Sequence, residues 1–136
     1  MIWFDAALEY PADDELLERC VAAVLSEDVE SVDIVHGIEN MQNAPITCVV
    51  HDGSPGEYSQ LVTIYLSEDF RQPDIIESGA RLAQLLERSL LLANDATTDP
   101  FSFIFVSKTG ARSMVSVDAD ELDRNDRYRI VKPDDL

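Results

Sequence analysis

Two β-rich segments flank a short stretch of turn-forming residues, and this arrangement strongly constrains the fold. The segments are ITCVV (residues 46–50) and YSQLVTIYL (58–66), and HDGSPGE (51–57) joins them. Asp, Gly, Ser and Pro each favour turns for their own backbone reasons. A chain that reverses direction over so few residues pairs its flanking strands antiparallel, so we predict a β-hairpin.

The same stretch contains a histidine, a carboxylate and a serine, the residue types of a catalytic triad. His51 and Asp52 are adjacent in sequence, and adjacent side chains of a strand point to opposite faces of the sheet. They therefore cannot form the His–Asp pair of a triad. Ser54 also lacks the G-x-S-x-G context of a nucleophile elbow. We interpret the stretch as a turn.

Two segments have the apolar spacing of amphipathic helices. In the first, Asp13 can cap the helix, and apolar residues recur at helical spacing from Leu16 to Val24. The second starts near Pro73, and its apolar positions continue to residue 92, so we expect a longer helix there. Gly79 would let its backbone approach a sheet closely.

Strand-like segments surround these helices. Besides the hairpin, alternating or apolar β-rich patterns occur at residues 2–8, 29–36, 101–106 and 112–117. RYRIV (127–131) is a possible last short strand. Gly110 marks the turn of a second hairpin. The order β-α-β-β-β-α-β-β predicts an α+β fold, with a largely antiparallel sheet and the two helices on one face. We expect a single domain over residues 1–136.

The segment DADELDRND (118–126) superficially resembles a calcium-binding loop. Its sixth position is Asp123 instead of glycine, and the twelfth position of such a loop would be Arg129 instead of glutamate. Asp118 followed three residues later by Glu121 is instead typical of a helix cap.

No cofactor-binding motif occurs, and we expect neither a cofactor nor a metal. His36 and His51 could meet in space, but no spacing selects a metal site. Cys20 and Cys48 occupy apolar positions, and we predict that both are buried and reduced, as in a cytoplasmic protein. The N-terminus lacks the basic region of a secretory signal, and no apolar run is long enough for a membrane helix.

The charge is large and uneven. The net charge is −17, and residues 1–79 contribute −15 of it, from 17 Asp and Glu against Arg19 and Arg71. Residues 80–136 hold 10 acids and 8 bases. Solubility, or a salt-rich habitat, is one explanation of this acidity. The other is an acidic surface for a basic protein partner, because nucleic acid itself would be repelled.

In size, acidity and architecture, the chain resembles the immunity proteins of bacterial toxin systems. That resemblance implies a non-enzymatic protein that blocks the active site of a basic, nuclease-type toxin. The candidate contacts lie in DDELLE, SEDVES, HGIEN and GEY. The predicted partner-binding residues are Glu18, Glu27, Asp28, Glu30, Glu39, Asp52, Glu57 and Tyr58.

Two other functions fit the sequence. In the first, edge strands form a homodimer in a structural or assembly protein, and the charge serves solubility. In the second, two carboxyl groups in a deep pocket act as a small hydrolase, a pairing that sequence cannot reveal. Trp3 and Tyr10 could anchor a partner, although such aromatics more often belong to a core.

Overall fold

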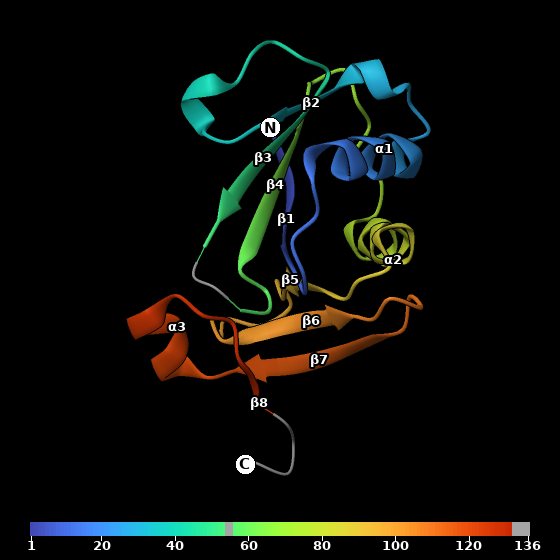
Figure 1. Cartoon of the computed structure of the whole chain (residues 1–136). Helices are drawn as coiled ribbons and strands as arrows, with labels where there is room; N and C mark the ends of the chain where they lie inside the picture. Colours follow the sequence, from blue (N-terminus) through green and yellow to red (C-terminus); the bar gives the residue numbers. More distant parts are fainter. Residues whose placement is uncertain (54–55, 132–136) are drawn as a thin grey trace.

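The strands form one mixed sheet in the order β2-β3-β4-β1-β5-β6-β7-β8 (Figure 1). The structure is a computed structural model that describes residues 1–53 and 56–131. Neighbouring strands are antiparallel, except that β2 runs parallel to β3. The strands are β1 (Ile2–Leu8), β2 (Val32–Val35), β3 (Ile46–Asp52), β4 (Gln60–Leu66), β5 (Leu90–Ala93), β6 (Ser102–Val106), β7 (Arg112–Val117) and β8 (Ile130–Val131). The predicted α+β class, with a largely antiparallel sheet, is confirmed.

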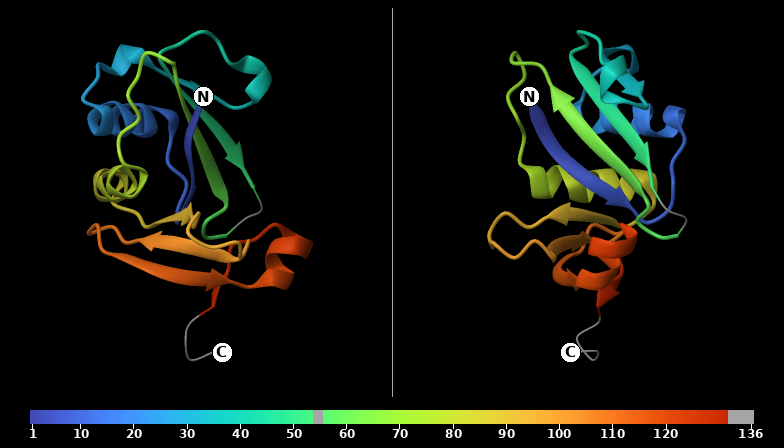
Figure 2. Two further views of the ribbon diagram at one scale, coloured as in Figure 1. Left: turned by 180° about the vertical axis from the view of Figure 1, so that it is seen from behind. Right: turned by 90° about the vertical axis from the view of Figure 1, so that its left-hand side faces the viewer.

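Three α-helices accompany the sheet in the described residues: α1 (Asp14–Leu25), α2 (Ile75–Leu86) and α3 (Ala119–Asn125). Two 3-10 turns, η1 (Val29–Ser31) and η2 (Ile38–Asn40), flank β2. Helices α1 and α2 lie side by side on one face of the sheet, as predicted, whereas Figure 2 (right) shows the other face of β1, β4 and β3 turned to the viewer.

The predicted hairpin is formed by β3 and β4. Their register pairs Ile46 with Leu66 at one end and Asp52 with Gln60 at the other. The Gly53 N–H closes the pairing by donating to the Ser59 carbonyl oxygen at 2.8 Å. Ser54 lies outside the described residues. His51 and Asp52 are both exposed at the end of β3.

The helix ends follow the predicted capping chemistry. The Asp13 carboxylate accepts a hydrogen bond from the Leu16 N–H at 2.8 Å, and Asp118 accepts one from the Glu121 N–H at 3.1 Å. Each cap satisfies a backbone donor that a helix leaves free in its first turn. The predicted close approach at Gly79 is also present, since a Cβ there would lie 2.6 Å from Leu92 Cδ1.

The expected length of the second helix is wrong. Helix α2 ends at Leu86, and Glu87 takes a left-handed conformation with φ 56°. The leucines that follow form β5, which lies between β1 and β6. A continuous apolar run has the same pattern in a buried strand as in a buried helix, so periodicity could not separate them. Leu90, Leu91 and Leu92 are all fully buried.

The predicted strand over residues 29–36 is also shorter than expected. Its first residues form η1, in which the Ser31 N–H donates to the Asp28 carbonyl oxygen at 2.9 Å. Only Val32–Val35 pair with β3. By contrast, the optional last strand is present as β8, which pairs with β7. Gly110 occupies the β6–β7 turn with φ 90°.

Two apolar cores lie on opposite faces of the sheet. The larger core packs the sheet against α1 and α2. The smaller one contains Tyr58, Leu91 and Val117, with side chains from β6 and α3 around them. Strands β6 and β7 run across the direction of β3 and β4 in Figure 1, and α3 lies on the side away from α1 and α2.

Tyr58 connects the start of β4 to the segment before β5. Its hydroxyl lies 2.6 Å from Ser89 Oγ, and its backbone N–H donates to the Glu9 carbonyl oxygen at 3.2 Å. The residue has φ 58°, a conformation that bulky side chains rarely adopt. Burial raises the pKa of its phenol. The packing around the ring therefore holds an unfavourable backbone conformation in place.

We expect Tyr58→Phe to destabilise the fold by about 1–2 kcal/mol, because the buried hydrogen bond to Ser89 is lost while the ring is kept. Urea unfolding measures this change. Tyr128→Phe is the matched control, since the Tyr128 hydroxyl has no hydrogen-bond partner among the described residues. Equal stability of the two variants would contradict this role for Tyr58.

Candidate functional site

The acidic part of the sequence also forms a separate part of the folded molecule. Residues 2–66 supply β1 to β4, which form one half of the sheet, and residues 90–131 supply β5 to β8, which form the other. We call residues 1–79 the acidic half. Within residues 1–53 and 56–131, only three ion pairs occur, namely His36–Asp14, Arg112–Glu77 and Arg129–Asp118. Most carboxylates of the acidic half therefore have no cationic partner.

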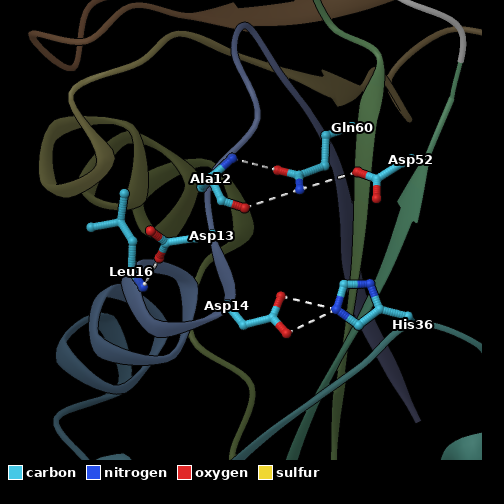
Figure 3. Close-up of polar contacts among 7 residues, drawn as sticks. All are labelled: Ala12, Asp13, Asp14, Leu16, His36, Asp52 and Gln60. Carbon is cyan, nitrogen blue, oxygen red and sulfur yellow. Dashed lines mark hydrogen bonds and ion pairs between the residues drawn. The ribbon is translucent and has the colours of Figure 1, made fainter.

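One group of carboxylates lies at the start of α1 (Figure 3). We call Asp13, Asp14, Asp52, His36 and Gln60 the α1 cluster. Its carboxylates already have partners in the chain: Asp13 caps α1, Asp14 contacts His36, and Asp52 accepts a hydrogen bond from Gln60 Nε2 at 3.4 Å.

Gln60 positions this cluster. Its side chain is buried, and its Oε1 accepts a hydrogen bond from the Ala12 N–H at 2.8 Å. Its Nε2 donates to the Ala12 carbonyl oxygen at 3.0 Å. One amide thus satisfies both backbone groups of a buried residue and fixes the chain just before α1.

The His36 ring lies against the Asp14 carboxylate. Its Nε2 is 2.8 Å and 3.0 Å from the two carboxylate oxygens. This hydrogen bond raises the pKa of His36, and the charges of Asp14 and Asp52 act in the same direction. Both side chains remain about half exposed, at 53% and 51%.

A second group of carboxylates surrounds β2, the first strand in the sheet order. We call it the edge cluster, and its members are Glu27, Asp28, Glu30, Asp33 and Glu39. Among the described residues, none of these side chains accepts a hydrogen bond or forms an ion pair. Four of the five side chains are exposed and Asp33 is half-buried, so these carboxylates are available to an external cation.

The edge cluster follows β2 along its length. Glu30 lies in η1 just before the strand, Asp33 lies within it, and Glu39 lies in η2 beyond it. A Cβ on Gly37 would collide with the Glu39 carboxylate, so this carboxylate folds back toward the end of β2.

The predicted partner-binding residues do not share one site. Glu30 immediately precedes β2, whose first residue pairs with Ile46 at the start of β3, whereas Asp52 ends β3. Six residue steps of strand separate these ends, about 20 Å. This separation applies to Glu27, Asp28 and Glu30 of the edge cluster, whereas Glu39 lies beyond the opposite end of β2, three residues after His36. Asp52 falls in the α1 cluster.

Three other predicted residues lie elsewhere. Glu18 is half-buried on α1, and Glu57 is exposed near the end of the hairpin. Tyr58 is only 5% exposed, so its ring is largely covered by the protein itself. Tyr58 belongs to the smaller core, and the apolar side chains around it come from distant parts of the chain. The residues next to Tyr58 in sequence therefore did not indicate its burial. Of the other two aromatics, Trp3 is buried and Tyr10 is exposed.

Sequence reasoning missed two participants. Asp33 is not among the predicted partner-binding residues, although the alternation of this acid with Val32 and Ile34 is a signal that places it on the polar face of a strand. Gln60 carried no signal, because its role depends on a backbone 48 residues away.

An open groove of about 610 Å³ lies between the end of the hairpin and the α3–β8 connection. Its lining is mixed in charge, with Glu57, Glu121 and Asp126 beside Arg127 and Arg129. Glu57 and Asp126 are exposed to solvent.

No arrangement of metal ligands is present in the described part of the chain, where no three His, Cys, Asp or Glu side chains come together. His36 contacts Asp14, and no described contact joins it to His51. Cys20 and Cys48 are free and buried, as predicted, and burial raises the pKa of Cys48 to about 12.

The chain matches no known family model, no curated protein and no solved structure. Within residues 1–53 and 56–131, no helix combines the length and apolarity needed to cross a membrane. A functional proposal therefore rests on the geometry of the two acidic clusters and the groove.

We expect Gln60→Leu to destabilise the fold by about 1–3 kcal/mol, because the buried Ala12 N–H and carbonyl lose their partner. Denaturant unfolding measures the loss. The control is Gln42→Leu, at an exposed loop position, which should change stability by less than about 0.5 kcal/mol. A Gln60→Leu variant as stable as this control would contradict the positioning role.

The His36–Asp14 contact predicts a pH dependence. Because the pKa of His36 is raised above 6.5 in the folded chain, its protonated ring stabilises the folded state. This contribution is complete below about pH 6.5 and disappears as pH rises through the folded-state pKa. NMR titration of the ring should give a midpoint above 6.5 that falls in Asp14→Asn. The control variant Asp69→Asn, at an exposed site, should leave the His36 midpoint unchanged. If the midpoint is also unaltered in Asp14→Asn, the His36–Asp14 contact does not form in solution.

Proposed function

We propose that this chain is a non-enzymatic binding protein that neutralises a basic protein partner. The specific proposal is a cytosolic immunity protein that occludes the positively charged cleft of a nuclease-type toxin. The observation that supports it most is the edge cluster, whose carboxylates have no partner among the described residues.

The physical argument is one of charge complementarity. A nuclease binds phosphates through a basic cleft, and carboxylates presented by a protein can occupy the same positive potential. Opposite potentials accelerate association and select the partner. A carboxylate that has no internal partner gives up only hydration on binding, whereas those of the α1 cluster would also lose contacts within the chain.

The homodimer alternative is disfavoured at β2. Pairing two copies along this edge would bring Asp33 and the flanking Glu30 and Glu39 of each chain together, and like charges would repel. At the other end of the sheet, the described part of β8 comprises Ile130 and Val131.

The hydrolase alternative depends on the groove. A carboxylate-based hydrolase usually keeps one carboxyl group in apolar surroundings so that it can act as an acid. Two of the three carboxylates that line the groove are exposed, which favours a solvated surface. A charge that serves solubility alone remains the simplest competing explanation.

A binding titration separates these functions. The purified chain is titrated with the product of the toxin-like gene beside its own, at about 50 and 500 mM salt. We expect binding that inhibits the toxin and weakens at least roughly tenfold at the higher salt. The absence of a toxin-like neighbour, or of binding at low salt, would overturn the proposal.

Charge-neutral variants supply the control for solubility. Neutralising Glu27, Asp28, Glu30 and Glu39 together, as Gln or Asn, should weaken binding at least roughly tenfold. Neutralising four exposed acids in the rest of the chain, Glu87, Asp95, Asp120 and Asp123, changes the net charge equally. Equal effects of the two quadruple variants would show that charge acts only in a general way.

A further inference from the structure

The outer edge of β2 is open for hydrogen bonding. Strand β2 begins the sheet order, and among the described elements it packs mainly against β3 and α1. In a parallel pair, alternate residues direct their N–H and C=O groups toward the partner strand, so the other residues of β2 direct theirs outward. An exposed row of such groups is a template for another strand.

The surroundings of this edge determine which strand could pair with it. The edge cluster supplies carboxylates before, within and after β2, and the bases nearest in sequence are Arg19 and Arg71. Val29, 40% exposed, and Ile38, 64% exposed, add an apolar side chain at each end. The edge thus combines backbone groups, negative charge and small apolar contacts.

We propose that the β2 edge binds an extended basic segment of the partner by strand addition. Backbone hydrogen bonds to β2 would fix the segment, and its Lys or Arg side chains would meet the edge cluster. This inference rests on the proposed function and names the part of the partner that is recognised. The carboxylates of the edge cluster repel a second copy of this chain and attract a basic strand. The same side chains therefore disfavour the wrong partner and favour the right one.

The geometry sets the length and pattern of that segment. Strand β2 has four extended residues, Val32–Val35, which span about 13 Å. Ile34 packs against the core under α1, so the neighbouring Asp33 points to the opposite face of the sheet. Basic side chains at alternate positions of the added strand would lie on the face of Asp33.

The other candidate surfaces fit a basic segment less well. The carboxylates of the α1 cluster have partners within the chain. The groove carries Arg127 and Arg129 among its acids, so it offers a basic segment both attraction and repulsion. The α1 cluster contains no strand edge among the described residues, and the groove reaches only Ile130 of β8, the last strand in the sheet order.

A peptide titration followed by NMR tests strand addition. The probe is a peptide of roughly ten residues that alternates lysine with valine. At low salt, we expect shifts of the Val32–Val35 amides and slowed hydrogen exchange of those that point outward. The same peptide with N-methyl groups along one edge should bind at least roughly tenfold more weakly, because those backbone hydrogen bonds cannot form.

Charge-reversal variants locate the binding site. Glu30→Lys and Glu39→Lys should each weaken peptide binding about fivefold, whereas Asp120→Lys and Asp123→Lys, equal in charge, should change it less than about twofold. All four positions are exposed, so the fold should tolerate the substitutions.

The outcomes separate this inference from the proposed function. Peptide shifts confined to the α1 cluster or the groove, or equal binding of the N-methylated peptide, would overturn strand addition. If the toxin-gene product binds but the peptide does not, strand addition is also overturned while the proposed function stands. If neither binds at low salt, both fail.

Discussion

The antiparallel pairing of β1 with β5 holds the two halves of the sheet together, and the rest of the structure depends on it. Ala6, Ala7 and Leu8 pair with Leu92, Leu91 and Leu90, and all six side chains are buried. Because β5 contributes to both cores, removing its side chains would expose the two faces at once. This junction also keeps the acidic half on one side of the molecule, with most bases on the other.

That separation has an electrostatic cost and a functional use. Carboxylates gathered without counter-charges repel one another and reduce the stability of the folded chain. In the α1 cluster, capping, the His36 contact and the Gln60 amide offset this repulsion. In the edge cluster nothing in the described residues offsets it, so a basic partner would relieve the repulsion on binding. Strand β2 thus combines carboxylates that have no partner among the described residues with open backbone groups.

The sequence predicted those features that depend on neighbouring residues. Asp13 and Asp118 cap helices, Gly110 forms a turn, and the 51–57 stretch joins a hairpin, all because local chemistry decides them. Features that depend on distant packing were missed. The leucines at 90–92 form a strand because β1 and β6 enclose them, and Tyr58 is buried because the second core surrounds it. The charge asymmetry was visible in the sequence, but its division into two clusters required the parallel pairing of β2 with β3.

The central claim is that the uncompensated carboxylates around β2 hold a basic partner. Hydrogen exchange of the chain, free and bound to the product of the neighbouring toxin-like gene, tests it most directly. The account predicts that exchange slows across residues 27–40 on binding, with the strongest protection at the outward amides of Val32–Val35. Protection confined to the groove near α3 and β8, with residues 27–40 unchanged, would contradict it.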